Sequence, residues 1–431
     1  MGKDLLAILK EEIKPALGCT GPISIAYVTS VARKAAGGNP KAVRVIMDKD
    51  SYKGNVAVGI PGTPLKGLDI AAALGALAGN PDVGLEVLKG VTPEDEKRAE
   101  DFLGNVVIEV NAKLKGIGLS VDAFVKTDEG EGHAKIFKTH DNVVLIEANG
   151  EVKFKKEIDD EATDSIDYSK DEIRQYGAKD FFDFAKREPL ENLLFLRETV
   201  KLNEALYKAG LDRKLGAGIG STLMEVLPSS FISRAKARAA AAADARMAGL
   251  DIPAMSCATS GNAGLTASVP LISIREDLEK SEEELLRSLA LSFLLTISVK
   301  SHIGRLSSIC SCTIGSSIGV AAGTVLLMGG SLSQAERAIN SLIGAIGGIV
   351  CDGAKAGCAL KLADSVGAGI ESALLSMKGT GIPKRNGLVC DSADESITAI
   401  GKLALEGMVP ATDVMFNIIM ERDNVASIVN E

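Results

Sequence analysis

The sequence predicts an α+β domain followed by a mostly α-helical domain rich in glycine and alanine. Segments with the apolar patterns of strands are concentrated in the first 150 residues, where they do not alternate strictly with helices. Beyond residue 189 the apolar residues recur at helical steps, and strand patterns are few. The chain has 45 glycines, no tryptophan and only 4% aromatic residues. This composition favours elements that pack at close backbone distance.

The first part of the chain begins with helices and continues mainly with strands. Residues 3–36 are expected to form a helix pair or a broken helix, interrupted by Pro15 and Gly18. Helices are also expected over residues 67–79, bounded by glycines, and 93–104, which begin at a proline. Strands are expected over residues 41–47, 55–60, 106–110, 119–127, 133–139 and 142–148.

A polar, acidic and weakly periodic stretch, residues 150–188, marks the boundary between the two parts. We therefore predict an α+β domain over residues 1–188 and an all-α domain over residues 189–431. The first helices, residues 1–36, can pack on the helical domain instead. The clearest helical patterns of the second domain are at residues 189–211 and at the alanine-rich residues 229–250.

Charge and apolar run length limit the class of protein. A net charge of −9 argues against a nucleic-acid-binding face and against binding to anionic membranes. The longest apolar runs, such as residues 289–299, are shorter than the ~20 residues of a membrane span. The N-terminus lacks the pattern of a signal peptide. We expect a cytoplasmic protein, in which seven cysteines are not a disulfide framework.

Cysteines recur in one region as Cys310, Cys312, Cys351 and Cys358. The interval from Cys310 to Cys351 is long enough for a helix out and a helix back, which would bring these cysteines together. If residues 351–358 were continuous helix, their two sulfurs would share one face. Zinc is the weaker candidate, because the spacing is no short knuckle and the chain has three histidines. Three thiolates with no evident fourth ligand suit a 4Fe–4S cluster with one open iron, and buried cysteines in tight helix contacts are the alternative.

A second candidate is the segment CATSGNAGLTAS, residues 257–268. Ser260, Asn262 and Gly264 would present a hydroxyl, a carboxamide and backbone N–H groups ahead of an apolar segment, an arrangement that can hold an amino-acid carboxylate. The segment is similar to the Ser-Gly-Asn loop of pyridoxal-phosphate β-eliminating enzymes, but no lysine motif stands shortly before it. An ordinary helix N-cap is the alternative.

Weaker candidates lie nearer the N-terminus. Cys19 follows Gly18 in a kink. A thiol at a helix start can have a lowered pKa and serve as a base or nucleophile, and the alternative is a thiol that only packs in the core. Lys53 and Asn55 precede a Pro-Gly turn, where they face either substrate or solvent. A joint metal site of His133 and His140 is not expected, because seven residues along a strand place them on opposite sides.

Seven segments in order along the chain carry a family resemblance. They are PALGCTGPISIAY, YKGNVAVGIPGT, GHAKIF, SGNAGLTASVP, GRLSSICSC, CDGAKAGCALKLA and GMVPATDVMFNIIM. Together they resemble the L-cysteine desulfidase family, whose helical domain is related to the iron–sulfur L-serine dehydratases. The resemblance covers nearly the whole chain, and seven ordered motifs are far more specific than any single one.

The resemblance implies a cytoplasmic lyase that splits L-cysteine into pyruvate, ammonia and sulfide without pyridoxal phosphate. It implies a 4Fe–4S cluster bound by Cys310, Cys351 and Cys358, with Cys312 as the alternate for the first position. The fourth iron would be open and would act as a Lewis acid. An acidic amino-acid residue is expected after the Cys-Thr pair, and this chain has Gly21 there.

In this scheme each remaining candidate receives a role. Cys19 would remove the α-proton, and the carboxylate would be held by Ser260, Asn262 and the turn that ends at Gly264. Lys53 and Asn55 would be additional substrate contacts. The expected partner is a small amino acid, with no nucleic acid and no membrane, and a homodimer is left open. Two alternatives remain: an L-serine or other hydroxy-amino-acid dehydratase with the same cluster, and a non-catalytic iron–sulfur or redox-sensing protein.

Overall fold

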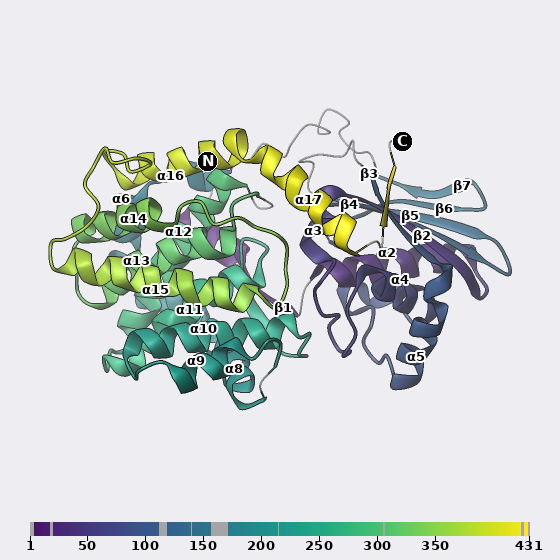
Figure 1. Ribbon diagram of the computed structural model, residues 1–431, viewed down its shortest axis with the longest axis horizontal. Coiled ribbons are helices and arrows are strands. Elements are labelled where there is room, and N and C mark those ends of the chain that lie inside the picture. Colours follow the sequence, from purple (N-terminus) through teal and green to yellow (C-terminus); the bar gives the residue numbers. More distant parts are fainter. Residues whose placement is uncertain are drawn as a thin grey trace.

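The computed structural model describes residues 4–17, 20–111, 119–138, 140–156, 171–213, 215–304, 307–423 and 426–429. Helices and strands segregate into a helical part and a part built on a sheet, which lie side by side (Figure 1). The sheet is formed mainly by the N-terminal region and the helical part by the C-terminal region. Both components of the predicted fold class are therefore present.

The elements have the following bounds. The strands are β1 (Ile13–Leu17), β2 (Pro40–Asp48), β3 (Val106–Asn111), β4 (Leu119–Thr127), β5 (Glu131–Lys138), β6 (Val143–Ala148), β7 (Glu151–Lys155), β8 (Pro253–Cys257) and β9 (Ala426–Val429). The helices of the first half are α1 (Leu5–Glu12), α2 (Thr20–Ala36), α3 (Lys49–Asn55), α4 (Leu68–Leu77), α5 (Pro93–Phe102), α6 (Ala178–Arg187), α7 (Leu190–Leu193) and α8 (Arg197–Arg213). Those of the second half are α9 (Ile219–Val226), α10 (Phe231–Met247), α11 (Gly261–Asp277), α12 (Glu282–Ile303), α13 (Ser316–Leu327), α14 (Leu332–Ile346), α15 (Cys358–Met377), α16 (Ala393–Lys402) and α17 (Val409–Asp423).

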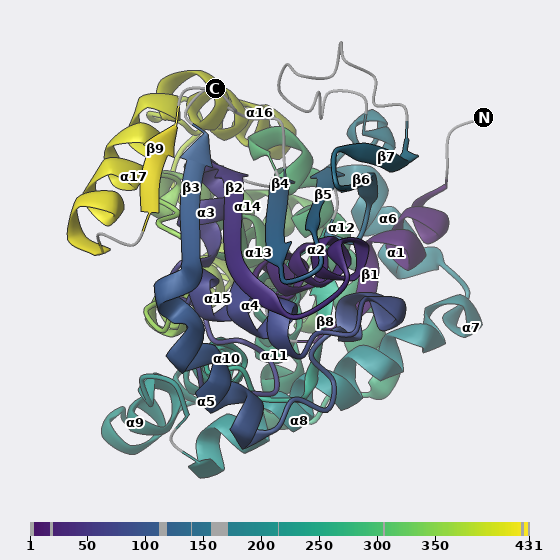
Figure 2. The ribbon, with the colours of Figure 1, turned by 90° about the vertical axis from the view of Figure 1, so that its right-hand side faces the viewer.

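Seven strands form one sheet in the order β7-β6-β5-β4-β2-β3-β9. β3 pairs in parallel with both β2 and β9, whereas the other pairs are antiparallel. Alternate residues of β2, namely Val43, Val45 and Met47, are buried in one core with apolar residues of α2 and α4. Figure 2 shows these two helices behind the sheet. The period-two pattern of the sequence thus reflects one sheet face that packs on helices.

Close backbone contacts hold the helical part together. The alanines at positions 239–243 of α10 are fully buried. A Cβ atom added to Gly210 of α8 or Gly220 of α9 would lie 2.0 or 2.2 Å from backbone atoms of Ala241. Helices can approach this closely only where the side chains between them are glycine or alanine. The high content of these two residues therefore has a packing reason.

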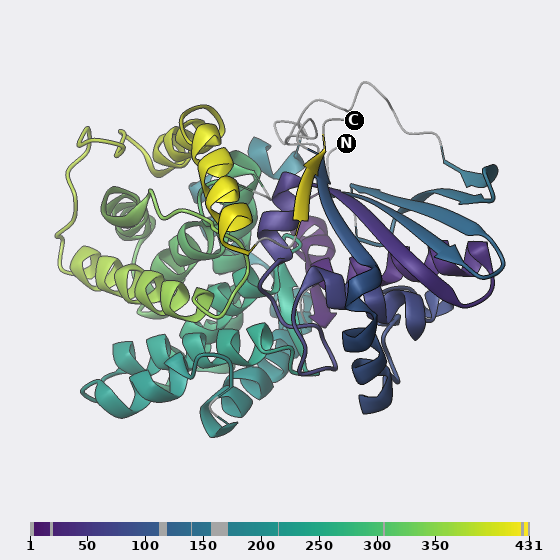
Figure 3. The ribbon, with the colours of Figure 1, turned by 45° about the vertical axis from the view of Figure 1, so that its right-hand side comes forward.

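Each end of the chain also contributes to the part formed mainly by the other end. α1 packs Leu9 into the helical core, and β1 pairs antiparallel with β8. α17 places Phe416 in the core beneath the sheet, with its ring centroid 5.9 Å from that of Tyr52. β9 lies at the sheet edge beside β3 (Figure 3). The division at residues 188 and 189 stays a prediction.

Several local predictions are wrong. Residues 55–60 are not a strand: Asn55 ends α3, and Gly59 forms only an isolated bridge with Lys66 because its backbone packs against that of Ala248. The helix pair predicted over residues 3–36, by contrast, is confirmed as α1 and α2: strand β1 separates them and contains Pro15, which lacks the N–H that a helix interior needs. Residues 351–358 are not a continuous helix, because α15 begins only at Cys358.

No helix within the described ranges is by itself long and apolar enough to cross a membrane. One pair bent by 55°, Ala393–Gly407 with Val409–Arg422, meets the length and composition requirement when its two members are taken together.

Candidate functional site

The predicted helical hairpin brings Cys310 and Cys351 together. α13 runs out and α14 runs back, and an isolated bridge between Ile309 and Val350 closes the base of the hairpin. The N–H of Cys310 donates to the carbonyl of Ile349 at 2.8 Å, and that of Cys351 donates to Ser308 at 2.8 Å. Backbone hydrogen bonds on both sides therefore fix the two cysteines beside each other.

Cys312 and Cys358 join this pair from two helix beginnings. Cys312 lies in the π-helical turn that leads into α13, and Cys358 is the first residue of α15. The turn before Cys358 is tied to the sheet part, because the N–H of Ala354 donates to the carbonyl of Gly54 at 3.0 Å. We call Cys310, Cys312, Cys351 and Cys358 the cysteine group. Thiolates at helix N-termini are favoured by the helix dipole.

Hydrogen bonding among the thiols divides the cysteine group by pKa. Hydrogen bonds with Cys312 and Cys351 raise the pKa of Cys310 well above its usual range. The same bonds lower the pKa of Cys312 to about 5 and that of Cys351 to about 6. Burial raises the pKa of Cys358 to about 11. Within the group, the thiol pKa is therefore lowered at Cys312 and Cys351 and raised at Cys310 and Cys358.

Three buried cations surround the cysteine group. Lys300 is 1% exposed, Lys53 4% and Arg246 6%. The hydrogen bond with Cys310 is the main cause of the lowered pKa of Cys312, and the charges of Lys300 and Arg246 also lower it. The charge of Lys53 likewise lowers the pKa of Cys351. Burial of three positive charges in one region favours an anionic occupant.

The turn before α11 places Ser260 against the cysteine group. Ser260 is the N-cap of α11, where its Oγ accepts from the N–H of Ala263 at 3.2 Å. The same Oγ lies 3.1 Å from the Sγ of Cys312. The N-cap interpretation is therefore correct, and it coexists with a contact to the cysteines.

Asn262 faces Arg246 from the first turn of the same helix. The Oδ1 of buried Asn262 accepts from Nη1 of Arg246 at 3.1 Å. A Cβ atom on Gly261 would lie 2.2 Å from Nε of Arg246, so the guanidinium group packs directly on this glycine. The first N–H groups of a helix have no intrahelical acceptor. Arg246 therefore lies beside a helix start that can bind an anion.

Gly264 has a packing role in the structure. Its N–H donates to the carbonyl of Ser260 at 3.1 Å, and a Cβ atom there would lie 1.9 Å from the carbonyl oxygen of Met255. The glycine thus allows α11 to pack on β8, which fixes the turn between them.

Helix α3 carries both Lys53, whose charge acts on Cys351, and Asn55. Lys53 pairs with Asp50 at 3.4 Å, and Asn55 donates to the carbonyl of Ser51 at 2.7 Å. A Cβ atom on Gly21 would lie 1.8 Å from the Oδ1 of Asn55. The Asn55 side chain therefore occupies the space that any side chain at position 21 would need.

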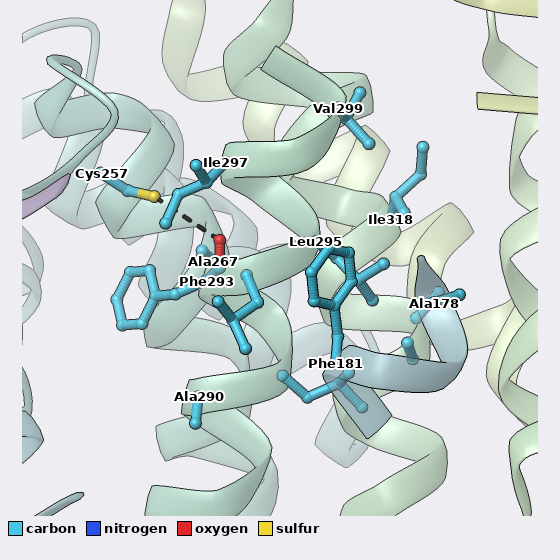
Figure 4. Close-up of a cluster of buried hydrophobic side chains, with 14 of the residues drawn as sticks. Ala178, Phe181, Cys257, Ala267, Ala290, Phe293, Leu295, Ile297, Val299 and Ile318 are labelled. Carbon is cyan, nitrogen blue, oxygen red and sulfur yellow. Dashed lines mark hydrogen bonds between the residues drawn. The ribbon is translucent and has the colours of Figure 1, made fainter. Parts of the chain in front are cut away.

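Two further cysteines among the described residues, Cys257 and Cys390, do not join the group. Cys19, the predicted base, lies outside the described residues. Cys257 is fully buried among apolar side chains, with its Sγ 4.0 Å from the carbonyl oxygen of Phe293 (Figure 4). Cys390 contacts the carbonyl of Leu388 at 3.7 Å.

His133 belongs to the sheet. Its Nδ1 is 2.8 Å from Glu147 and its Nε2 is 2.9 Å from Asp122, and its ring stacks on Phe124 with centroids 4.1 Å apart. Burial lowers the pKa of His133, but hydrogen bonds to the two carboxylates outweigh burial, and the net shift is upward.

The cysteine group fits an iron–sulfur cluster better than a single ion. Among the residues that the structure describes, no three His, Cys, Asp or Glu side chains are arranged to hold one metal ion. In a four-iron cube each cysteine binds a different iron, so its ligands need not converge on one point. Cysteines from the two segments that precede α13 and α15, close to buried cations, are a suitable donor set for an anionic cluster.

Sequence reasoning missed Arg246 and Lys300. Lys300 is the only Lys, Arg, Asp or Glu in the segment TISVKSH, and charged residues are almost never fully buried unless paired. An isolated cation in a helical stretch was therefore the available signal for Lys300. Arg246 follows Asp244 by two residues in ADARMAG and has no such signal. The expected charge pair within CDGAKAGC is present, because Lys355 and Lys361 both contact Asp352.

Comparisons with known proteins identify the family of the chain. A family model described as "Serine dehydratase alpha chain" matches residues 82–416, which include the cysteine group and the turn before α11. A UPF0597 protein of Clostridium tetani is 39% identical over 97% of this chain and 99% of its own length. UPF0597 proteins of Caldanaerobacter subterraneus and Photobacterium profundum are 37% and 39% identical, over 98% and 96% of this chain and 100% and 97% of their own lengths. The chain therefore belongs to the serine dehydratase alpha chain family.

Proposed function

We propose that this protein is an iron–sulfur lyase that eliminates the β-substituent of a small amino acid, with L-cysteine as the substrate and pyruvate, ammonia and sulfide as products. The observation that carries the proposal is the cysteine group, which lies against the N-cap Ser260 and is surrounded by buried cations. Cys310, Cys351 and Cys358 would hold a 4Fe–4S cluster. Bound there, the cluster would supply an open iron as a Lewis acid for the leaving sulfur.

Cys312 is assigned outside this ligand set. Its Sγ contacts the hydroxyl of Ser260, on the side of the turn before α11. The thiol of Cys310, by contrast, is hydrogen-bonded to those of both Cys312 and Cys351. With Cys310 as the first ligand, Cys312 would remain free to contact the hydroxyl of Ser260. If Cys312 were a fourth ligand, it would occupy the open iron. The proposal therefore requires that Cys312 is not a cluster ligand.

The substrate carboxylate is placed at the start of α11. Arg246 would pair with it, and the first N–H groups of the helix with the Ser260 hydroxyl would orient it. Asn262 holds the guanidinium group through its Oδ1. This placement fixes the α-carbon, and therefore the α-proton, relative to the cysteine group.

Proton removal is assigned to Cys19, because a thiol at a helix start can serve as a base. Loss of the α-proton and of the β-sulfur as sulfide gives aminoacrylate, and water converts this product into pyruvate and ammonia. Lys53, held by Asp50, and Asn55 are the residues of α3 that would contact substrate from the sheet part.

L-serine is the second candidate substrate, with hydroxide as the leaving group. The specific observation in its favour is the description of the matching family, a serine dehydratase chain. The same residues would bind the carboxylate, because the two amino acids differ only in the atom attached to the β-carbon, sulfur in L-cysteine and oxygen in L-serine.

Anaerobic reconstitution tests the proposal. Iron and acid-labile sulfide are measured first, and then pyruvate from L-cysteine and from L-serine, together with sulfide from L-cysteine. The expected result is a bound 4Fe–4S cluster with preference for L-cysteine. Cys351→Ser should lose bound iron and turnover, whereas Cys390→Ser, outside the cysteine group, should keep both. Full iron content in Cys351→Ser would refute the ligand assignment. Faster turnover of L-serine than of L-cysteine would make L-serine the preferred substrate and refute L-cysteine in that role.

A further inference from the structure

The turn that places Ser260 has an unusual backbone. Ala258 has a φ of 46° and Thr259 a φ of 66°. Two hydrogen bonds close the turn: Ser260 N–H donates to Cys257 at 3.1 Å, and Cys257 N–H donates to Ser260 at 3.0 Å. Two consecutive central residues with positive φ are typical of type I′ turns, which favour Asn and Gly. Alanine and a β-branched threonine are unfavourable there.

Contacts to both backbone groups of Ala258 hold this conformation. Its N–H donates to the carbonyl of Glu12 at 2.9 Å. Its carbonyl oxygen accepts a hydrogen bond from Nζ of Lys300 at 2.7 Å. Lys300 lies near the end of the buried helix α12 and is itself 1% exposed. A buried ammonium group therefore binds a carbonyl whose direction depends on the left-handed conformation.

We propose that Lys300 is a positioning residue that holds the left-handed turn Cys257–Ser260, so that the Ser260 hydroxyl stays against Cys312. Without this hydrogen bond, Ala258 and Thr259 would relax toward negative φ. The relaxation would rotate Ser260 away from Cys312 and would shift the start of α11. Lys300 acts through the turn and not on the substrate. The consequence for substrate binding rests on the proposed function, whereas the structural role does not.

The competing explanation is that Lys300 acts only through its charge on the cysteine group. The two explanations differ in their dependence on residue 259. If Lys300 holds a strained turn, replacing Thr259 by glycine removes the strain at that residue, leaves only that of Ala258, and makes Lys300 less necessary. If only the charge matters, the residue at position 259 has no influence. Thr259 is solvent-exposed, so its replacement removes no packing.

Hydrogen–deuterium exchange on the protein without a cluster tests the structural role. The variants are Lys300→Met, Thr259→Gly and the double variant, with Lys280→Met, just before the other end of α12, as the matched control. Lys300→Met should accelerate exchange of the turn amides by about tenfold, whereas the same change made together with Thr259→Gly should accelerate it by less than about threefold. Lys280→Met should leave the turn unchanged. If Lys300→Met does not fold, Lys300→Gln is measured against the same expectation.

Equal acceleration with and without Thr259→Gly, or none in either case, would overturn the proposal. Kinetics of the reconstituted protein supply a second readout, in which KM should rise about tenfold in Lys300→Met and recover in the double variant. An unrecovered KM would assign Lys300 to a direct charge effect and would also overturn the proposal. Absence of turnover in the unmodified protein would refute the proposed function alone, because the exchange measurement does not depend on catalysis.

Discussion

Gly353→Ala is the substitution whose effect follows most directly from the geometry of the cysteine group. Gly353 lies between Cys351 and Cys358 with a φ of +92°, and a Cβ atom there would lie 1.9 Å from the carbonyl oxygen of Lys53. The left-handed conformation costs an alanine about 1–2 kcal/mol. The clash with a backbone oxygen adds about 1–3 kcal/mol, the usual cost of overpacking. We therefore expect a loss of about 2–5 kcal/mol in the free energy of unfolding.

Gly379→Ala is the matched control. Gly379 has a φ of +79°, and nothing lies within 4 Å of an added Cβ atom. Only the conformational cost of about 1–2 kcal/mol should therefore appear. Urea unfolding followed by circular dichroism measures both variants, because the chain has no tryptophan for fluorescence. Iron content after reconstitution should fall in Gly353→Ala and remain unchanged in Gly379→Ala. Equal destabilisation of the two variants would refute the role assigned to the contact between Gly353 and Lys53.

Three further outcomes are expected. Arg246→Gln should raise KM about 10- to 100-fold with a smaller change in kcat, since a hydrogen bond between charged groups contributes about 1.5–3 kcal/mol; Arg238→Gln on the same helix should leave KM unchanged. Cys19→Ala should keep the iron content of the unmodified protein but lose pyruvate formation, and normal turnover would place the base elsewhere. His133 has a raised pKa in the folded state, so its stabilising contribution is present below pH ~6.5 and is lost as pH rises through the folded-state pKa. The free energies of unfolding of the protein and of His133→Gln, measured against pH, should therefore converge above that range. A difference that stays constant with pH would contradict the assignment.

The sequence was sufficient where local spacing determines geometry. The interval between Cys310 and Cys351 accommodates two helices and little else, so the hairpin could be predicted before any contact was known. Ser260 could be predicted as a polar helix start because a hydroxyl before an apolar helix is a local signal. Both features depend on residues close to each other in the chain, or on the length of chain between them.

Features that depend on distant partners could not be predicted. Residues 55–60 have a strand pattern, but Gly59 packs on Ala248, which is nearly two hundred residues away along the chain. The burial of Arg246 and Lys300 depends on how α10 and α12 surround the turn before α11. No periodicity within either helix distinguishes a cation that faces a site from one that reaches solvent.

The sheet part contains α17 and β9, which the ribosome makes long after the other elements of that part. It therefore cannot finish folding until these two elements have been synthesised. The core that contains Tyr52 stays incomplete until Phe416 has left the ribosome, although most of its strands are made within the first third of the chain. The early strands must wait with an exposed edge at β3, and such edges promote aggregation. A chain interrupted before α17 would leave both the apolar core and this edge uncovered. Quality-control proteases and chaperones would therefore be able to distinguish an unfinished chain from a finished one.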